Sequence, residues 1–321
     1  MKYFRCQVCD STDNKLFFKT RDYDADGRIL FNVFKCSKCG LVSLNPQPSR
    51  KLLSTHYVLN YYGNRSFFYN IFSFINNFII KSKSAYLSKR KKGKLLDIGC
   101  GDGDFLKNMK DDGWQVYGIE PSKSGAELSR RRLKDNVYNA ELEKVKFPNG
   151  FFDVVTMWHV LEHVHKPNDI VKEVGRITRK NGIFIVAVPN IDSFQARIGG
   201  KKWFHLDVPR HLYHFSPKTL NKLLENNGFK VEKIKHFSFV YNLIGVIQTS
   251  LNMIGVRFNF LHHLIKRVDR QKSYIYFNFI INFLLTFVFG AILFIPAVLI
   301  SLTESALDHG ATITVYSRKI S

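Results

Sequence analysis

The stretch "KLLDIGCGDGDFLKNM", residues 94–109, decides the fold. Its first residues, Lys94 to Ile98, form a short apolar run that predicts a buried β-strand. The turn that follows is rich in glycine and begins with an aspartate: Asp97, Gly99, Gly101 and Gly103. A helix is predicted from Asp104 to Lys110. This is the first β-turn-α unit of a doubly wound α/β sheet, in which ligands bind beyond the carboxyl ends of the strands.

The spacing of this turn indicates the kind of ligand. Glycines let a ligand approach the backbone closely, but the G-x-G-x-G spacing differs from the G-x-G-x-x-G of dinucleotide binders. A carboxylate at the strand end, Asp97, suits a ligand with a cationic or amino-bearing end rather than a pyrophosphate. The next predicted strand, "QVYGIEPS", ends in Glu120, and a carboxylate there can accept both hydroxyls of a ribose.

Further strands follow along the chain. "FFDVVTMWHVLEHVHKP" predicts a fourth strand from Phe152 to Met157 and then a short helix, and "KNGIFIVAVPN" predicts a fifth strand. In "FSPKTLNKLLENNGF", Ser216 as N-cap, Pro217 in the first turn and Gly228 at the end delimit a helix. "KVEKIKHF" and "ATITVYSRK" would supply the sixth and seventh strands of the sheet.

Taken in order, these motifs resemble a known family. "LLDIGCGDGDF", "GIEPS", "FDVVTMWHVLEHV" and "GIFIVAVPN" together resemble the class I methyltransferases that use S-adenosylmethionine. The subgroup resembled includes ubiquinone-biosynthesis O-methyltransferases and sugar methyltransferases of polysaccharide clusters, and "WFHLDVPRHLYHFSPKTL" strengthens that match. The resemblance covers about Gly93 to Phe237 plus the last strand, and implies a seven-stranded Rossmann-like sheet.

The resemblance also implies roles for individual residues. The methionine end of S-adenosylmethionine would be lined by Asp97, Gly99, Gly101 and Gly103. Glu120 would hold the ribose. Residues Ala140 to Leu142 would lie beside the adenine, and Leu142 is the one among them expected to contact it. Trp158 and His159 follow the fourth strand, where the family places residues near the sulfonium. A glycine turn in a non-catalytic doubly wound domain is the alternative, which the ordered set of motifs disfavours.

Histidines near this edge offer two kinds of chemistry. His159, Glu162 and His163 are spaced to share one face of a helix. A histidine can remove the acceptor's proton, or the set can hold a divalent metal. In quinone O-methyltransferases the corresponding motif starts with an acidic residue and binds a divalent cation. His159 replaces that residue, which argues against magnesium and for zinc or no metal. A purely structural Glu–His pair is the third interpretation.

A second polar set lies between the fifth strand and the following helix, where the family covers its acceptor pocket. Its members are His205, Asp207, Arg210, His211 and His214. Arg210 would suit an anionic acceptor, and His211 is an alternative base. The candidates for the catalytic base are therefore His159, His163 and His211. One methyl transfer needs at most one base, so most of these histidines must be structural or orient the substrate.

The N-terminus predicts a metal-binding module. Two Cys-x-x-Cys pairs, Cys6 with Cys9 and Cys36 with Cys39, would aim four thiolates at one tetrahedral site for a structural Zn²⁺. Strand-like runs, "KLFFKT" and "ILFNVFKC", flank the turn "DADG" between the pairs. Four thiolates leave no open position, so the site is structural, with a redox pair as the minor alternative.

Composition limits the partners. The 321 residues are 45% hydrophobic, which supports a folded core and excludes a disordered protein. The net charge of +22 indicates an anionic partner, unless it only reflects a basic proteome. The N-terminus lacks the apolar core of a signal peptide, which predicts a cytoplasmic protein. An apolar segment from Phe67 to Ile80, followed by seven basic residues between Lys81 and Lys94, suits either an anionic membrane surface or a helix packed on the next domain.

A long apolar segment precedes the last strand. Tyr274 to Thr303 carries no charge and would span about 45 Å as one helix. If the sixth and seventh strands are antiparallel neighbours, the chain from Ser238 to His309 leaves and returns on one side of the molecule. Two crossings, through residues 239–260 and 276–299, are disfavoured by polar residues in the first and by the basic loop between them. A re-entrant or interfacial hairpin fits better, and a packed helical pair or a dimer interface is the alternative.

These features divide the chain into five parts. We expect a zinc-ribbon-like module (1–45), a linker with an amphipathic, basic helical segment (46–92), a methyltransferase core (93–237), an apolar helical insertion (238–309) and the last strand of the sheet (310–321). The function expected is methylation of a glycan or lipid-linked acceptor at the inner face of the cytoplasmic membrane. A quinone-like or other small acceptor and a nucleic-acid-binding zinc-ribbon protein are the alternatives, and the oligomeric state stays open.

Overall fold

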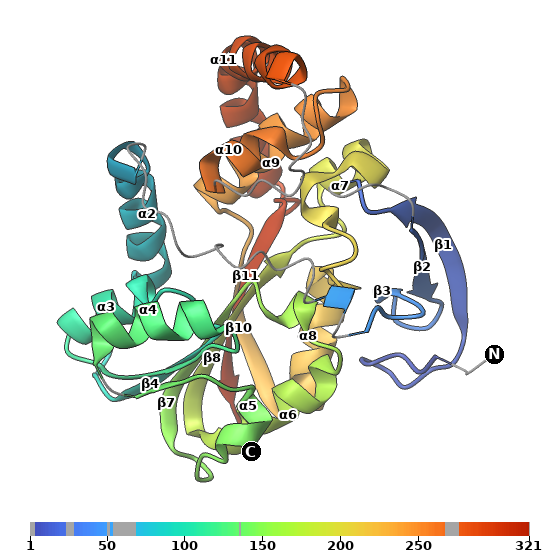
Figure 1. Ribbon diagram of the computed structural model, residues 1–321. Helices are drawn as coiled ribbons and strands as arrows, with labels where there is room; N and C mark the ends of the chain where they lie inside the picture. Colours follow the sequence, from blue (N-terminus) through green and yellow to red (C-terminus); the bar gives the residue numbers. More distant parts are fainter. Residues whose placement is uncertain are drawn as a thin grey trace.

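The central sheet has seven strands in the part of the chain that the computed structural model describes, residues 4–23, 29–49, 52–53, 69–134, 136–266 and 276–320. The strands are β4 (Lys94–Ile98), β5 (Gln115–Ile119), β6 (Val137–Tyr138), β7 (Phe152–Trp158), β8 (Thr178–Pro189), β10 (Phe229–Lys235) and β11 (Thr312–Lys319). Their order is β10-β11-β8-β7-β4-β5-β6, with β11 antiparallel to both of its neighbours and the other pairs parallel (Figure 1). The doubly wound, Rossmann-like sheet predicted from the sequence is confirmed.

Helices cover both faces of this sheet. The first face carries α3 (Asp104–Asp111) and α4 (Lys123–Leu133), and the second carries α5 (Leu142–Val145), α6 (Pro167–Ile177) and α8 (Pro217–Asn226) (Figure 1). Helix α2 (Tyr69–Ser84) packs against α3 and extends beyond the sheet (Figure 1). Helix α8 starts as expected, because Ser216 accepts from the Thr219 amide and Thr219 returns a bond to the Ser216 amide in a capping box. All carboxyl ends of the parallel strands therefore meet at one edge, where a ligand would bind.

The N-terminal residues form a second sheet that includes a strand from the core. Strands β1 (Asn14–Arg21), β2 (Leu30–Cys36), β3 (Val42–Leu44) and β9 (Tyr213–His214) pair in this order. Strand β9 comes from the loop between β8 and α8, and it joins the ribbon through the pair Val42 and His214. The two strand-like runs between the cysteine pairs are strands, whereas the "DADG" turn lies outside the described residues. The ribbon is therefore bonded directly to the loop that carries the histidines.

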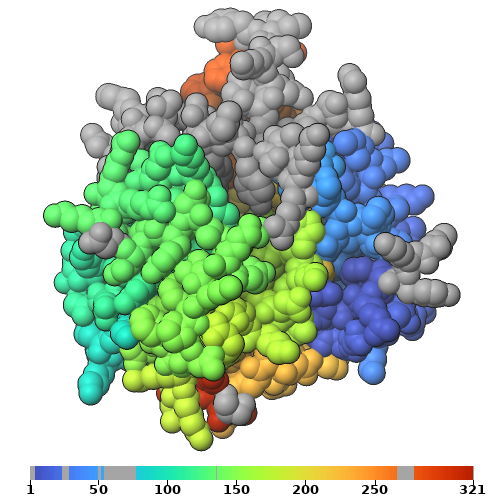
Figure 2. All heavy atoms as spheres, turned by 60° about the horizontal axis from the view of Figure 1, so that its bottom comes forward, coloured from blue at the N-terminus to red at the C-terminus, as the bar shows by residue number. Residues whose placement is uncertain are grey.

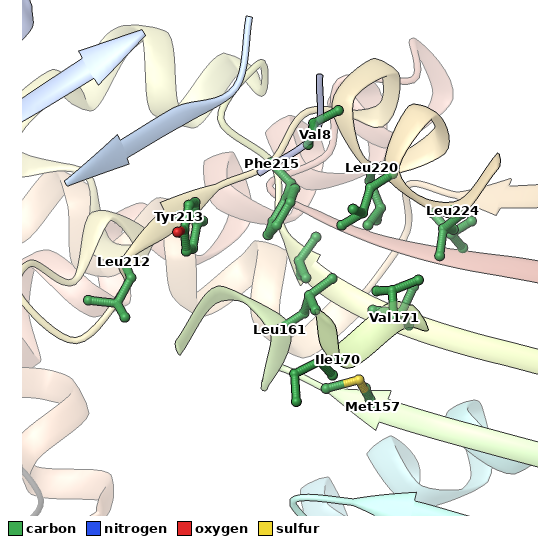
Figure 3. Close-up of a cluster of buried hydrophobic side chains, with 14 of the residues drawn as sticks. Val8, Met157, Leu161, Ile170, Val171, Leu212, Tyr213, Phe215, Leu220 and Leu224 are labelled. Carbon is green, nitrogen blue, oxygen red and sulfur yellow. The ribbon is translucent and has the colours of Figure 1, made fainter. Parts of the chain in front are cut away.

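This ribbon also shares its hydrophobic core with the methyltransferase sheet. Val8 of the ribbon lies beside Phe215 and Leu220 in a cluster that continues to Leu161 and Met157 (Figure 3). Space-filling atoms show the N-terminal residues lying directly against the core (Figure 2). One continuous core contains both parts, so the ribbon holds a fixed position relative to the sheet.

The insertion between β10 and β11 is helical and stands on the carboxyl edge of the sheet (Figure 1). It consists of α9 (Phe239–Met253), α10 (Phe260–Lys266) and α11 (Tyr276–Ala306). Residues Asn278–Ala306 of α11 form the one helix in the described part of the chain that is long and apolar enough to cross a membrane. Helix α9 is instead packed inside the molecule, because it lies between α7 (Phe194–Gly199) and α11 and buries most of its side chains.

Candidate active site

The glycine-rich turn after β4 has the conformation that only glycine adopts readily. Gly99, Gly101 and Gly103 have φ angles of 75°, 58° and 80°. A Cβ atom on Gly99 would lie 2.4 Å from Cγ2 of Val160, so the turn also passes too close to the loop after β7 for a side chain. The Gly99 amide donates to the Ile119 carbonyl at 2.7 Å, which joins the turn to the neighbouring strand. The predicted cradle is therefore present at the end of β4.

Glu120 closes the same cradle from the end of β5. Its buried carboxylate accepts from the backbone amides of Gly101 and Ser122, at 2.9 and 2.8 Å. Burial raises the pKa of Glu120, although both amide bonds oppose this effect. The side-chain amide of Asn139 donates to the backbone carbonyl of Glu120 at 2.9 Å. This bond fixes the loop that leads to Leu142, the buried first residue of α5. The residues predicted for the ribose and the adenine thus lie at one edge.

Asp97 lies at the end of β4 and is 3% exposed. Thr156 of β7, its partner in the parallel register, donates to Oδ1 of Asp97 at 2.6 Å. Burial raises the pKa of Asp97 to about 7, while the bond from Thr156 and the positive charge of Lys83 oppose the rise. A buried carboxyl with so little opposing charge is suited to a ligand that brings a positive charge of its own.

Trp158 and His159 end the next strand. The indole of Trp158 packs edge-on against Phe105 of α3, with ring centroids 5.6 Å apart, and Nζ of Lys83 lies 5.0 Å from the indole centroid. His159 has a φ of 57°, an unusual conformation for a non-glycine residue, and its ring lies 4.5 Å from that of Tyr241 on α9. Burial, reinforced by Lys83, lowers the pKa of His159 to about 3, so this imidazole is neutral near pH 7.

These residues fit S-adenosylmethionine. Two buried carboxylates, Asp97 and Glu120, lie on either side of a glycine turn whose backbone carries no side chains, and the cofactor offers an amino group and a ribose. Trp158 and His159 come at the end of β7, next to β4, where the family places the sulfonium. The cofactor residues predicted from the sequence are brought together at one sheet edge, and their individual roles remain proposals.

The segment after His159 is shorter than predicted. Leu161–His163 forms one 3₁₀ turn rather than a helix with three residues on one face, so the shared-face prediction is wrong. His159 still meets Glu162, with Nδ1 3.4 Å from Oε1, but His163 instead faces His211, with ring centroids 4.7 Å apart. The structure therefore divides the three candidate bases into His159 on one side of Glu162 and a pair of histidines on the other.

Glu162 is the unusual member of this group. It is 1% exposed, and neither of its carboxylate oxygens has a hydrogen-bond partner among the described residues. Burial raises the pKa of Glu162 to about 7, and the interaction with His163 is the main influence that lowers it. Burial also lowers the pKa of His211 well below its usual value, and the charge of His163 adds to that effect. A buried carboxyl that accepts no hydrogen bond needs a proton, an imidazolium or a cation to compensate it.

Glu162, His163 and His211 have the features of a metal site. One ligand atom from each lies within 4.8 Å of the others. Nδ1 of His163 lies 3.0 Å from the Arg210 carbonyl, and Nδ1 of His211 lies 2.8 Å from the His205 carbonyl, which directs Nε2 of each ring away from the backbone. This is how metal-binding histidines are usually oriented. Two imidazoles and one carboxylate fit zinc better than magnesium.

The same loop carries Arg210 and His214. Arg210 donates to Asp207, three residues earlier, and its contact with an anionic acceptor stays a prediction. Neither ring nitrogen of His214 has a hydrogen-bond partner among the described residues. The contributions of Lys83 and Tyr241 are not predictable from the sequence, because only the tertiary structure brings α2 and α9 to this edge.

The cysteine cluster fits a tetrahedral metal. Cys6, Cys9, Cys36 and Cys39 have their sulfur atoms within 4.8 Å of one another. The Sγ atoms of Cys6 and Cys39 are 3.4 Å apart, and those of Cys9 and Cys36 are 3.5 Å apart. Zinc with four thiolates at about 2.3 Å would separate them by about 3.8 Å. Four thiols at this spacing are compatible with a structural zinc ion.

Comparisons with known proteins agree with this geometry. The family model described as "Methyltransferase domain" matches residues 71–234, just over half of the chain. The "Ubiquinone biosynthesis O-methyltransferase" of Pelagibacter ubique is 30% identical over 176 residues, covering 51% of this chain and 72% of that protein. A "Probable S-adenosylmethionine-dependent methyltransferase" of Mycolicibacterium smegmatis is 28% identical, covering 46% of this chain and 56% of that protein.

Solved structures include similar folds. A SAM-dependent methyltransferase from Archaeoglobus fulgidus is 19% identical, covers 79% of this chain and all of its own chain, and gives a TM-score of 0.49. The family match, the order of the strands and the cradle at the end of β4 lead to the same assignment. The chain belongs to the methyltransferase domain family and is a class I methyltransferase that uses S-adenosylmethionine.

Proposed function

We propose that this enzyme methylates a hydroxyl of a glycan or lipid-linked acceptor at the inner face of the cytoplasmic membrane. The cofactor supplies an activated methyl group, so the chain itself must bind the acceptor, orient it and take its proton. Asp97 and Glu120 would hold the two ends of the cofactor, with the glycine turn between them and Leu142 beside its base. Trp158 would form the wall next to the reacting atoms.

One observation carries the proposal for the membrane: α11 has its apolar side chains on the outside. Its exposed residues include Phe287, Ile292 and Ile295, at 72%, 64% and 69% exposure. On the side that faces the rest of the molecule, the fully buried residues are small or polar: Thr286, Ala297, Ser301 and Glu304. Phe289, Leu293 and Val298 pack there while only partly buried. Of the 18-residue apolar window within Asn278–Ala306, only 11% is buried. A helix in water has the opposite pattern, whereas small and polar residues are the usual contacts between helices in lipid.

The topology then limits how α11 enters the bilayer. The insertion leaves the sheet after β10 and returns into β11, and these strands are antiparallel neighbours. Both ends of the insertion therefore lie at the carboxyl edge, the same edge of the sheet that carries the glycine turn. We propose that the outer side of α11 dips into one leaflet while α9 stays packed beneath it, and that α11 thereby holds the active-site edge against the membrane. A nucleic-acid partner would leave this apolar surface unexplained.

His159 is the residue that we propose as the general base. It ends β7 beside the cofactor cradle, and Glu162 lies behind its Nδ1 at 3.4 Å. Burial lowers the pKa of His159 to about 3, so its Nε2 can accept the proton of the acceptor hydroxyl only if the resulting positive charge is stabilised, and the Glu162 carboxylate would supply that stabilisation. His163 and His211 would orient this group. A divalent metal held by Glu162, His163 and His211 is the alternative; it would stabilise the acceptor oxyanion at the same place.

The experiment is methyl transfer from S-adenosylmethionine, labelled on its methyl group, to a total lipid extract of the source cells. We expect label in the lipid-linked glycan fraction. Glu120→Ala should weaken cofactor binding, measured by calorimetry, by roughly tenfold or more because it removes a charged hydrogen-bond acceptor. Label only in lipids that carry no glycan would favour a quinone-like or other small acceptor, and a cofactor-bound enzyme that labels no glycan-bearing lipid would overturn the proposal.

A further inference from the structure

A narrow pocket adjoins the cofactor cradle and has no role in the proposed methyl transfer as described above. It lies between the end of α2, the tips of β7, β8 and β11, and the first turn of α9. Trp158 and His159 form its floor, and these are the residues proposed to lie beside the reacting atoms. Asp97, Glu120 and the glycine turn do not line it. The pocket is therefore on the acceptor's side of His159, outside the cradle for the cofactor.

Its charged lining residues are both lysines. Lys83 from α2 and Lys235 from the end of β10 line the pocket, and no aspartate or glutamate does. Lys235 is half-buried and, among the described residues, no carboxylate lies within ion-pairing distance of it. Burial lowers the pKa of Lys235, and the neighbouring charge of Lys233 adds to this effect. A partly desolvated lysine without a partner is a costly feature that an anionic ligand would compensate.

The other walls are mainly aromatic. Phe78 of α2 meets Phe239 of α9 edge-on, with ring centroids 6.0 Å apart, and both line the pocket together with Tyr241. This contact bridges the two helices that border the pocket. An apolar chain can therefore lie against these rings while a charged group reaches the lysines.

The pocket also begins where the apolar insertion meets the sheet. Ser305, in the last turn of α11, donates to the carbonyl of His236 at 3.2 Å, one residue after Lys235. Lys235 therefore lies beside the last turn of α11, and it lines the same pocket as His159. A molecule that left a bilayer along α11 would thus meet this positive charge and the proposed base in one pocket.

We propose that the acceptor is an anionic amphiphile, with a phosphate or carboxylate group bound by Lys235 and Lys83 and its apolar part held between α2 and α9. This inference rests on the proposed function, because it assumes that acceptors approach His159 from the lipid side. It adds the chemical class of the acceptor: an acidic group adjoining an apolar chain, on the way to the hydroxyl that is methylated. Lys235 is a specificity-determining residue in this scheme.

The test measures binding without turnover. Full-length protein with S-adenosylmethionine bound is titrated with dodecyl phosphate, dodecyl maltoside or inorganic phosphate, and complexes are counted by native mass spectrometry in a nonionic detergent. We expect wild type to bind one dodecyl phosphate, with dodecyl maltoside and inorganic phosphate each binding at least roughly tenfold more weakly. Lys235→Ala should weaken dodecyl phosphate binding by roughly tenfold, and Lys235→Arg should largely restore it.

The matched control is Lys233→Ala, which removes a neighbouring exposed lysine that does not line the pocket. It should leave dodecyl phosphate binding unchanged, and all three variants should bind S-adenosylmethionine as wild type does. Equal binding of dodecyl phosphate by wild type and Lys235→Ala would overturn the inference, as would equal binding of dodecyl maltoside and dodecyl phosphate. If wild type did not bind S-adenosylmethionine, that result would count against the proposed function. Failure of the inference and failure of the proposed function are therefore distinguishable.

Discussion

At the scale of single residues, Asp97 shows how one buried carboxyl can select the charge of a ligand. It is held by Thr156 and lies near Lys83, yet burial still raises its pKa to about 7. The proton is therefore kept by the free enzyme up to about pH 7, whereas a bound ammonium group would favour the carboxylate. Binding of the cofactor should release this proton whenever the pH is below 7.

Cofactor affinity is accordingly expected to depend on pH in one direction. Above pH 7 Asp97 is already ionised and affinity is full; as the pH falls through about 7, affinity falls, reaching a roughly tenfold loss near pH 6. Calorimetric titration with S-adenosylmethionine from pH 6 to 8.5 measures this. Asp97→Asn should bind more weakly at every pH and lose the dependence. A wild-type affinity that stays constant across the range would show that Asp97 does not carry the proton.

The residues of the cradle were largely readable from the sequence, and their neighbours were not. Asp97 and Glu120 were predicted because each directly follows a recognisable apolar run. Thr156 was in principle readable, since parallel strands β4 and β7 place it opposite Asp97. Lys83 and Lys235 were not, because their approach to Trp158 depends on how α2 and β10 are placed by packing far from the motifs.

At the scale of elements, the insertion shows what an apolar run leaves undetermined. The run on α11 carries no charge from Tyr276 to Thr303, so the sequence predicts a buried or lipid-facing helix without telling which side contacts α9. Polar residues on α9 argued against a second crossing, and the structure gives their role: Gln248 donates to Asn252, which donates to the Lys202 carbonyl. The hydrogen-bonding groups of these side-chain amides are thus paired inside the molecule and need no water.

A charge on the outer side of α11 should therefore release the protein from membranes. Phe287 is 72% exposed and has no role in the packing of α9, so Phe287→Asp should abolish flotation with anionic liposomes while the fold and cofactor binding persist. Leu30→Asp is the control, since Leu30 is a 61% exposed apolar residue of the ribbon strand β2. It should float as wild type does. If Phe287→Asp also floats unchanged, the outer side of α11 does not contact lipid at this position.

At the scale of the whole molecule, the N-terminal ribbon and the methyltransferase sheet are one cooperative structure. Strand β9 belongs to the loop of the histidine cluster and pairs with β3 of the ribbon. The Leu44 amide donates to the Leu212 carbonyl at 2.9 Å, and the Leu212 amide donates to the Glu162 carbonyl at 2.8 Å. A short chain of backbone hydrogen bonds thus links the ribbon to Glu162, the carboxyl behind the proposed base, and the spacing of the cysteines alone did not predict this link.

Loss of metal from the ribbon should consequently be felt in the active site. Cys36→Ser removes one of the four thiols, so metal analysis should find one zinc ion per chain fewer than in wild type. Wild type should hold one zinc if the histidine cluster is empty and two if it binds metal. Because the core is continuous from Val8 to Met157, we expect a single unfolding transition with Tm lowered by several degrees.

Amide exchange locates the effect within the chain. In Cys36→Ser, exchange should accelerate at Leu44 and Leu212, whose amides lie in the link between the two sheets, and stay slow at Ile98 in the centre of the methyltransferase sheet. Lys38→Ser is the control, because Lys38 lies between Cys36 and Cys39 but offers no thiolate. A variant without zinc whose Leu212 amide exchanges as slowly as in wild type would show that the ribbon does not hold the histidine loop in place.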